Sequence, residues 1–471
     1  MKSFDEYFPT DEEKAVVKLV CEKSLKGFIK IVHRFRTGAK FTFKDFHNEI
    51  IKALEDRANY KTIKNLIINI PVGFGKSIIV EYFIAWCFIR NKNNCFLYTS
   101  YSDTLIKKHS GEIKEILSGE VCSKLWSYKF QKDKDSKTNW SIIGSIGRSG
   151  LTAGSMGGTI TGLDAGNPAV KKFCGAMIID DPIKATDIIF ETKREDCIYK
   201  FDNALGTRLR RDDVPIIIIM QRLKEEDLAG YLMKEGKYNK GLKEEDKDNW
   251  KKDWDLIKIQ ALQNEKSIWE EKISTKKLKK LRERLPWVFN SQYQQEPDSK
   301  INSNFKGLKF ATKEQEKLIE NGFGHIDKGF GGKDGTAFTI IKIVGNNLYV
   351  FGKLWQKHIN DCLTEIELYR VKYKCGQIRT EKNDDKGENA KKSKYIISYH
   401  EHDNKHLKIM THLYPAWKDI YFLQGTDPNY ISQCQNYNDK SKNDDAPDSL
   451  ASIIRYLKGG NRTVLVGSRP F

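Results

Sequence analysis

The chain has 471 residues and a formal net charge of +18, a size that predicts two or three domains, with two as the working number. No apolar run approaches the roughly 20 residues of a spanning helix, and the start Met1-Lys2-Ser3-Phe4-Asp5 is not a signal peptide, so we expect a cytosolic protein with no membrane partner. The charge favours a polyanionic partner, usually nucleic acid, unless it reflects a Lys-rich proteome. Nine cysteines without a C-x-x-C pair argue against a zinc ribbon or a disulfide framework.

The first half of the chain predicts an α/β fold. Two helical patterns, at residues 11–37 and 43–57, are followed by short apolar runs separated by helical segments. Such runs are typical of parallel strands covered on both faces, so we expect the mainly parallel sheet of an ATPase. The runs lie at residues 66–70, 95–100, 176–179 and 215–220.

The stretch PVGFGKS (71–77) lies between the first apolar run and an apolar helix, which is the context of a P-loop. Its glycines let backbone N–H groups approach phosphate, Lys76 reaches the terminal phosphates, and Ser77 is a ligand for Mg²⁺. Ile70 stands where the usual pattern has its first Gly, but the amides nearest the β-phosphate come from residues 73 to 77. We therefore predict an ATP and Mg²⁺ site, against the alternative of a chance Gly-rich turn. The predicted binding residues are Gly73, Phe74, Gly75, Lys76 and Ser77.

Polar residues follow the third and fourth apolar runs. In AMIIDDPIK (176–184), Asp180 is placed to hold Mg²⁺ through water and Asp181 to activate the attacking water. Gln221 follows the fourth run and is a candidate sensor of the γ-phosphate. The alternatives are an Asp-Pro turn and a plain strand-to-helix junction.

Three further features of the first half bear on the nucleotide. Phe46 and His47 are candidates for packing against adenine, although aromatic residues at this spacing are more often core. The Gly-rich stretch 147–166 predicts a mobile loop or hairpin near the nucleotide. Several arginines compete to reach the γ-phosphate, and the sequence does not choose among them. They are Arg148, Arg208, Arg210, Arg211 and Arg222.

The composition changes between residues 235 and 305. A Lys/Glu/Asp-rich stretch with helical spacing ends at Pro286, and NSQYQQEPDSKINSNF (290–305) follows. We place the boundary there, between a domain of residues 1–295 and one of residues 296–471. The second domain restarts with strands joined by a turn at residues 345–347, which predicts an antiparallel hairpin. These strands are expected at residues 324–327, 337–344 and 348–354.

Carboxylates far apart in the second domain form a second candidate site. Asp327 and Glu381 end predicted strands, and Asp445 and Asp448 share one face of a starting helix. Such a set can hold two Mg²⁺ or Mn²⁺ ions, which clamp the attacking water and the leaving oxygen of a phosphodiester. Each cluster alone has the ordinary alternative of helix capping. Which of Asp444, Asp445 and Asp448 bind metal directly is left open.

In their order, these motifs resemble the large terminase subunit of tailed bacteriophages. The resemblance implies an N-terminal ASCE-type P-loop ATPase that moves double-stranded DNA into a procapsid. It also implies a C-terminal RNase H-like nuclease domain that cuts concatemeric DNA. The matching pieces run from about residue 40 to 455: LIINIPVGFGKS, LYTSYSD, GSMGGTITG, IIDDPIK, IIMQRLKEEDLAGYL, NSQYQQEP, HIDKGFGGKDGTA, TEKNDDKG and DDAPDSLA.

The resemblance assigns the phosphate loop, the Mg²⁺ carboxylate, the coupling position and the nuclease carboxylates to residues already singled out. These are Lys76, Ser77, Asp180, Gln221, Asp327, Glu381, Asp445 and Asp448. Two positions depart from the family pattern, since Asp181 replaces the more usual Glu and Leu163 stands where an Arg is often found. The resemblance implies a small terminase subunit and a portal protein as partners. It further implies a ring oligomer on the portal, and host cytoplasm as the location, with transient docking on the procapsid.

Three other readings stay open from the sequence. A helicase-like, DNA-stimulated ATPase explains the first half but leaves the carboxylates idle. A resolvase-like nuclease explains the second half but not the P-loop. A non-catalytic, basic DNA-binding scaffold explains the charge alone.

Overall fold

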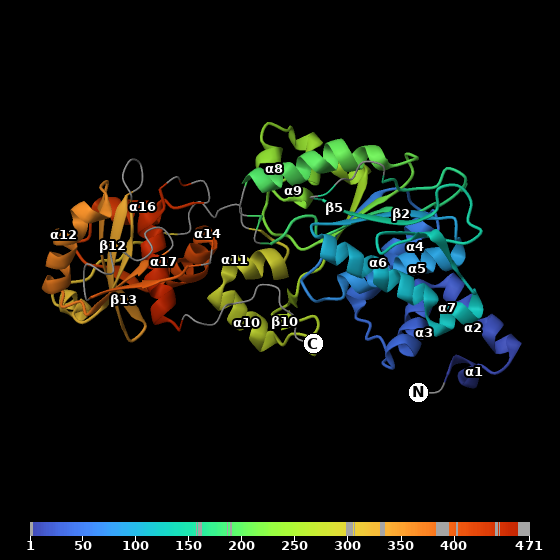
Figure 1. The fold of residues 1–471 in the computed structure, drawn as a ribbon, viewed down its shortest axis with the longest axis horizontal. Helices are drawn as coiled ribbons and strands as arrows, with labels where there is room; N and C mark the ends of the chain where they lie inside the picture. The colour runs from blue at the N-terminus through green and yellow to red at the C-terminus, as the bar shows by residue number, and fades with distance from the viewer. Residues whose placement is uncertain are drawn as a thin grey trace. The chain divides into compact units, whose positions relative to one another are not determined.

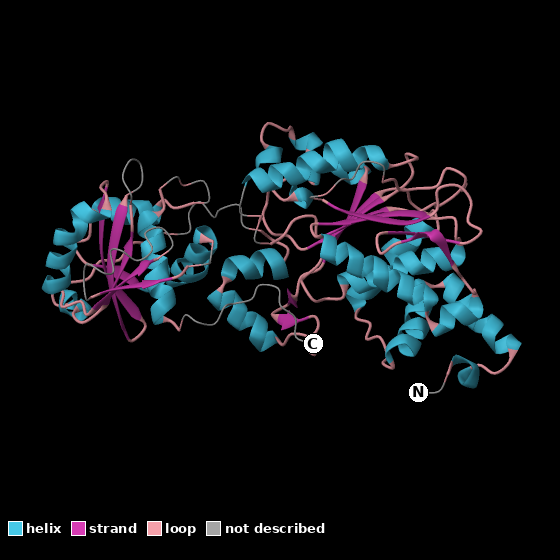
Figure 2. Ribbon diagram, in the orientation of Figure 1, coloured by secondary structure: helices cyan, strands magenta, loops and turns pink. Residues whose placement is uncertain are grey.

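The computed structural model describes residues 3–459 except 157, 159–162, 186, 189–190, 298–304, 306, 330–334, 383–394, 402–403, 439–440 and 442. The chain divides into two compact units, Met1–Asp298 and Ser299–Phe471. Each unit is built on its own β-sheet (Figures 1 and 2). Within the described residues, no helix combines the length and the apolar character needed to cross a bilayer.

The first unit contains an eight-stranded sheet in the order β3-β4-β5-β2-β6-β7-β1-β8. The six strands β5-β2-β6-β7-β1-β8 are parallel to their neighbours, whereas β3 and β4 pair antiparallel at one edge of the sheet. The predicted α/β, mainly parallel sheet is confirmed, and β7 inserted between β1 and β6 is the order of an ASCE-type P-loop ATPase. The strands are β1 (Asn65–Asn69), β2 (Cys95–Ser100), β3 (Phe130–Asp135), β4 (Asn139–Ile142), β5 (Gly150–Ser155), β6 (Met177–Asp180), β7 (Ile216–Met220) and β8 (Trp254–Lys258).

Helices cover both faces of this sheet, with α4, α5 and α6 along one face and α8 and α9 along the other (Figure 1). Alternate strand residues enter two separate cores, so Ile68 joins the first and Ile67 the second. This two-sided burial explains why the central strands β1, β2, β6 and β7 are mainly apolar. The helices are α1 (Phe4–Tyr7), α2 (Asp11–Lys23), α3 (Leu25–Thr37), α4 (Asp45–Ala58), α5 (Lys76–Arg90), α6 (Asp103–Ser118), α7 (Glu120–Leu125), α8 (Glu191–Lys200), α9 (Leu228–Leu232), α10 (Thr275–Arg284) and α11 (Pro286–Val288).

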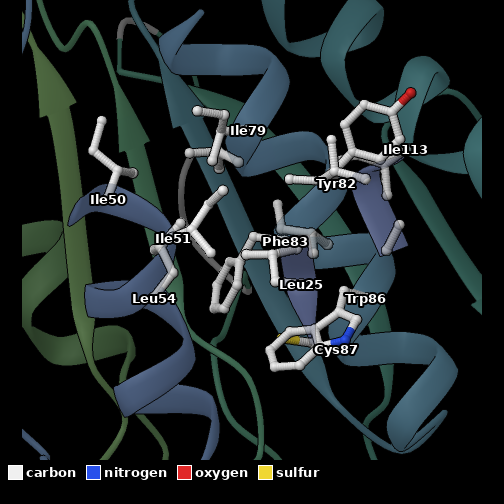
Figure 3. Packing of buried hydrophobic residues seen from close by; sticks show 14 of the residues in the cluster. Leu25, Ile50, Ile51, Leu54, Ile79, Tyr82, Phe83, Trp86, Cys87 and Ile113 are labelled. Atoms are coloured by element: carbon white, nitrogen blue, oxygen red, sulfur yellow. The ribbon is translucent and has the colours of Figure 1, made fainter. Parts of the chain in front are cut away.

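The first core anchors α5, the helix that follows the P-loop. Its residues Phe83 and Trp86 pack with Leu54 of α4 and Leu25 of α3 (Figure 3). The predicted helix at residues 11–37 is divided into α2 and α3 at Ser24, whose side chain caps α3 by accepting from the Gly27 N–H. Because every residue of α5 from Ile79 to Ile89 is buried, the P-loop before it has a rigid support.

Two sequence predictions in this unit need correction. The Gly-rich stretch 147–166 contains β5, which forms the predicted hairpin with β4 but is also a strand inside the main sheet; residues 157 and 159–162 of the stretch lie outside the described residues. Gly150 has a φ of +110° and approaches β4 so closely that a Cβ would lie 2.2 Å from the Trp140 carbonyl oxygen, so glycine here permits strand packing. The stretch 235–285 is helical only at α10 and in short 3₁₀ turns, since residues 254–258 form the edge strand β8. A polar, half-exposed edge strand lacks the apolar signal of the central strands.

The second unit contains a six-stranded sheet in the order β15-β14-β11-β12-β13-β16. Strands β11, β12 and β13 are antiparallel, whereas β14 and β15 run parallel to β11, which is an RNase H-like arrangement as predicted. The predicted hairpin is confirmed, with Val344 opposite Asn347 across the turn. The strands are β11 (Phe323–Asp327), β12 (Thr336–Val344), β13 (Asn347–Trp355), β14 (Gln377–Glu381), β15 (Ile396–Tyr399) and β16 (Ile420–Phe422).

The helices of the second unit pack on both faces of its sheet, with α12 on one face and α17 on the other (Figure 1). Helix α17 contacts β11 and β12 directly, and α14 lies against α17. This packing brings the start of α17 to the strand ends that carry the predicted carboxylates. The helices are α12 (Ile359–Lys372), α14 (Lys405–Lys408), α15 (Tyr414–Ala416), α16 (Pro428–Gln435) and α17 (Asp445–Leu457).

Candidate active sites

The predicted P-loop joins the carboxyl end of β1 to the first turn of α5. Gly73 and Gly75 have φ angles of +79° and +80°, in the left-handed region that glycine adopts at little cost. Ile70, at the position of the missing first Gly, is fully buried and donates its N–H to the Met220 carbonyl at 3.1 Å. Ile70 therefore belongs to the sheet, and the turn that can cradle phosphate begins after it.

Phe46 and His47 pack against Phe74 of the predicted P-loop. His47 is fully buried, and its Nε2 lies 3.1 Å from the Phe74 carbonyl oxygen. The Lys44 N–H donates to His47 Nδ1 at 3.0 Å, so the hydrogen of the neutral ring is on Nε2 and is donated to Phe74. The rings of Phe46 and Trp269 contact the imidazole, and both also pack against the ring of Phe74. This packing agrees with the core interpretation of Phe46 and His47 rather than with adenine stacking.

The burial of His47 predicts a pH-dependent stability. Burial lowers the pKa of His47 to about 4, whereas an unfolded histidine has a pKa of about 6.5. Below pH 6.5 the unfolded chain binds the extra proton, so the free energy of unfolding falls as the pH drops from 6.5 towards 4. We expect the wild type to lose about 2 kcal/mol more between pH 7 and 4.5 than a His47→Gln variant, which retains a donor to Phe74. Urea unfolding followed by tryptophan fluorescence measures this difference, and equal losses would contradict it.

Asp180 ends β6 and is nearly fully buried. Ser77 Oγ donates to its Oδ2 at 2.7 Å, and the Tyr98 hydroxyl, from the adjacent β2, donates to the same oxygen at 2.8 Å. Burial alone would raise the pKa of Asp180, but the nearby Lys76 ammonium and these donors hold it below the usual value. The pair of Ser77 and an ionised Asp180 is suited to Mg²⁺, which prefers hard oxygen ligands.

Asp181 differs from Asp180 although the two are adjacent. Its backbone has a φ of +45°, a conformation that non-glycine residues adopt mainly at turns and functional sites. Its carboxylate pairs with Lys76, whose Nζ also lies 3.5 Å from Asp180 Oδ1. Burial raises the pKa of Asp181, and the neighbouring Asp180 charge adds to this effect against the attraction of Lys76. The environments of the two carboxyl groups therefore shift their pKa values in opposite directions, as is typical of acid and base assignments.

Gln221 lies between the strands that carry these groups. It follows β7, which pairs with β1 on one side and with β6 on the other. Its side-chain Oε1 is buried and accepts no hydrogen bond from the described part of the chain. An unsatisfied buried amide at this point is positioned to respond to a change at either neighbouring strand end.

Four of the five candidate arginines lie at the amino-terminal ends of the parallel strands, whereas the P-loop lies at their carboxyl ends. Arg148 precedes β5, and its Nη1 pairs with Asp164 at 2.6 Å; Arg210 pairs with the same carboxylate. The Arg208 carbonyl accepts a hydrogen bond from the Ala165 N–H. Gly166, which follows Ala165, donates its N–H to the carbonyl of Cys95, the first residue of β2. The strands rise about 3.3 Å per residue, so their full length separates these arginines from the P-loop. Arg211, which precedes β7, pairs with Asp213.

Arg222 lies near the carboxyl end of β7, on the same side of the sheet as the P-loop, but its guanidinium pairs with other residues. Its side chain is 3% exposed and pairs with Asp227 at 3.1 Å and with Glu235 at 2.7 Å. A buried guanidinium between two carboxylates stabilises the local fold, and leaving them for a phosphate would unpair both. Leu163, where an Arg is often found, packs against the second core. None of the five described candidates therefore offers an available guanidinium at the P-loop of its own chain.

The second site gathers four acidic residues at one edge of the RNase H-like sheet. Asp327 ends β11 and Glu381 ends the neighbouring β14, while Asp445 and Asp448 occupy the first turn of α17. Asp448 is fully buried and Asp445 is 6% exposed. Burial raises the pKa of Asp327 well above its usual value, and the charges of Asp448, Asp445 and Glu381 raise it further against the attraction of Lys405. The structure thus brings together all four carboxylates that the sequence singled out.

Two lysines of α14 lie within this carboxylate cluster, and the sequence analysis missed both. Lys408 Nζ lies 2.8 Å from Glu381 Oε1 and 2.9 Å from Asp448 Oδ1. Lys405 Nζ lies 3.5–3.7 Å from Asp444 Oδ1, Asp327 Oδ2 and Asp448 Oδ2. Their i, i+3 spacing in the short helix KHLK was the available signal, since such residues share one helix face.

The carboxylate oxygens of the cluster are the kind of ligand that a hard cation prefers, but the described side chains are not arranged around one metal position. Asp327 Oδ2 and both oxygens of Asp448 are buried and accept no well-formed hydrogen bond from the described residues. Carboxylate oxygens of this kind suit Mg²⁺ or Mn²⁺. However, no three His, Cys, Asp or Glu side chains in the described part of the chain are set as ligands of one metal ion. The two ammonium groups hold the carboxylates instead.

No protein-family model and no curated protein sequence matches the chain. Among solved structures, it is similar to the large terminase of the thermophilic bacteriophage D6E, with 9% identity and a TM-score of 0.44 over 89% of this chain and 100% of that one. With the D6E large terminase in complex with ADP, the identity is 11% and the TM-score 0.41, over 90% of this chain and 100% of that one. With the HK97 bacteriophage large terminase, the identity is 12% and the TM-score 0.37, over 92% of this chain and 99% of that one. Similarities at these levels assign no function to the chain.

Proposed function

We propose that the chain is the DNA-packaging motor of a tailed bacteriophage, a large terminase subunit that hydrolyses ATP to move double-stranded DNA and cuts it with a metal-dependent nuclease. One observation carries this proposal. A P-loop at the end of an ASCE-type sheet and a buried carboxylate cluster at the end of an RNase H-like sheet occur in one chain. The helicase-like alternative leaves the second site unexplained, and a non-catalytic scaffold explains neither.

The P-loop side chains suggest how ATP would be bound and attacked. The backbone N–H groups of residues 73–77 would donate hydrogen bonds to the phosphate oxygens, and the positive end of α5 would attract their charge. Lys76, now paired with Asp181, turns towards the terminal phosphates when ATP binds, and this leaves Asp181 free to orient the attacking water. Ser77 and Asp180 would hold Mg²⁺, which would neutralise charge on the phosphate oxygens. Asp181, with its raised pKa, is the better base of the two carboxylates.

Gln221 is proposed to pass the nucleotide state to the rest of the first unit. It lies at the end of β7, next to both β1 and β6, and its amide oxygen is buried without a described hydrogen-bond partner. The following residue, Arg222, is tied to Asp227 before α9. A small movement of Gln221 would therefore shift a segment that is already rigidly coupled to it.

The second site is proposed to hydrolyse phosphodiester bonds of DNA. Asp327, Glu381, Asp445 and Asp448 would hold Mg²⁺ or Mn²⁺, which activates water for attack on the phosphate. The net charge of +18 supports contacts with the DNA backbone that do not depend on sequence. From the motif order we further propose a small terminase subunit and a portal protein as partners, a ring oligomer on the portal, and docking on the procapsid from the host cytoplasm.

A triplex-displacement assay tests the motor and separates it from a helicase. A protein that moves along intact double-stranded DNA strips a third strand from a triplex without separating the duplex. We expect ATP- and Mg²⁺-dependent release of a labelled third strand, with the duplex intact, and DNA-stimulated phosphate release. Strand separation instead would support the helicase-like alternative, and no ATP hydrolysis with DNA and procapsids present would support the scaffold.

A further inference from the structure

The lysines of α14 show how the carboxylate cluster is neutralised. Lys408 has no exposed side-chain surface, and its ammonium lies among Asp448, Glu381 and Glu401 at 2.9, 2.8 and 3.4 Å. An ammonium has three N–H groups, and here three carboxylates surround it. Moving such a charge out would unpair several buried groups at once, so Lys408 is a fixed part of the cluster.

Lys405 is held much more loosely than Lys408. Its side chain is 46% exposed, and its Nζ lies 3.6 Å from Asp327 Oδ2, 3.5 Å from Asp444 Oδ1 and 3.7 Å from Asp448 Oδ2. These distances exceed those of good hydrogen bonds. A long flexible side chain of this kind can move to solvent with little loss, because exposed ion pairs contribute little. Lys405 therefore marks a cation position that a competing ion can take.

Asp448 relates the two positions to each other. Its Oδ1 faces the Lys408 ammonium and its Oδ2 faces the Lys405 ammonium. In a two-metal site the two ions lie about 3.5–4 Å apart, a separation that the two oxygens of one carboxylate can span. Each ammonium group thus faces one oxygen of Asp448, as each ion of a two-metal site would, but only the ammonium of Lys405 is displaceable.

We propose that Lys408 is a built-in cation of this site, so that the cluster binds a single Mg²⁺ or Mn²⁺ at the position of the Lys405 ammonium, where the sequence predicts two ions. The inference rests on the proposed nuclease function. Asp327 and Asp448 are the main ligands, and each oxygen moves inward by about 1.5 Å to reach the roughly 2.1 Å of a Mg²⁺ bond. Lys408 is a positioning residue that holds Glu381 and Asp448 for this ion.

The number of bound Mn²⁺ ions tests the proposal without relying on cleavage. Isothermal titration of the nucleotide-free full-length chain carrying Asp180→Asn, which removes the carboxylate beside Ser77, with electron paramagnetic resonance of free Mn²⁺, is expected to show one ion per chain; the variants below are compared in this background. A Lys408→Met variant, with a side chain of similar length and no charge, is expected to bind two. A Lys405→Met variant is expected to bind one ion at least about fivefold more tightly, because the competing charge is gone. Asp327→Asn is the control that loses the ion.

The outcomes separate failure of the inference from failure of the nuclease proposal. Two ions in the Asp180→Asn background that are both lost in Asp327→Asn would overturn the role of Lys408, and so would unchanged affinity in Lys405→Met. If Lys408→Met does not fold, the number in the Asp180→Asn background and the Lys405→Met affinity still decide. No ion, or an ion that Asp327→Asn retains, would overturn the nuclease proposal itself. One ion in a protein that cuts DNA supports both.

Discussion

Replacing Lys76 with Ala is expected to abolish ATP hydrolysis, lowering kcat by about a thousandfold or more. Lys76 is the cation that contacts both Asp180 and Asp181, and it stands at the start of α5 where the terminal phosphates would lie. Loss of one preorganised charge at a phosphoryl group typically costs two to three orders of magnitude in rate. Steady-state phosphate release, with and without double-stranded DNA, measures the effect.

A matched control separates this chemistry from a general loss of surface charge. Lys107→Ala removes a lysine from the exposed side of α6 and is expected to hydrolyse ATP at the wild-type rate. Circular dichroism melting of both variants shows whether they fold. Wild-type hydrolysis by a folded Lys76→Ala protein would place the phosphate site somewhere other than residues 73–77.

Replacing Asp327 with Asn is expected to change cleavage and stability in opposite directions. Cleavage of supercoiled plasmid with Mn²⁺ should fall at least about a hundredfold, because a principal metal ligand is lost. Without divalent metal, the melting temperature should rise. Burial and then the charge of Asp448 raise the pKa of Asp327 well above its usual value, so the ionised group costs folding free energy at neutral pH, and an uncharged Asn avoids that cost.

The sign of this stability effect can be checked against pH. A carboxyl group with a raised folded pKa stabilises the fold at low pH, and this contribution is lost as the pH rises from about 4 through the folded pKa. The advantage of Asp327→Asn should therefore be present at pH 7 and shrink near pH 4. Asp361→Asn, at the exposed first turn of α12, is the matched control and should show neither effect. A lower melting temperature for Asp327→Asn, or undiminished cleavage, would contradict the interpretation.

The turn at residues 71–77, the candidate phosphate loop, was recognisable because its parts are adjacent in the chain. A buried strand, two glycines in the left-handed region and a Lys-Ser pair at a helix start form one local unit whose geometry depends little on the rest of the molecule. The central strands were predictable for a similar reason, since burial on both faces demands continuous apolar runs. Strands β5 and β8 were missed because close packing by glycine and exposure at an edge remove that signal.

The roles of the charged side chains were less predictable. Five arginines were equal candidates in the sequence, and sheet topology alone showed that four lie at the edge away from the P-loop while Arg222 is paired internally. In the same way, His47 could be read as a ligand for adenine until its packing under Phe74 was seen. These distinctions depend on where a strand begins and ends in space, which no local pattern encodes.

By itself, the sequence predicted the mainly parallel sheet of the first unit and the antiparallel hairpin of the second, and it singled out the turn at residues 71–77 and the strand-end carboxylates Asp180 and Asp327 as candidates. Only the tertiary structure decided which cations share space with those carboxylates: Lys76 between Asp180 and Asp181, and Lys405 and Lys408 among the acidic groups of the second unit. The reason is physical, because backbone turns and buried strands follow from neighbouring residues, whereas charges interact through space and long side chains reach partners brought near by distant segments.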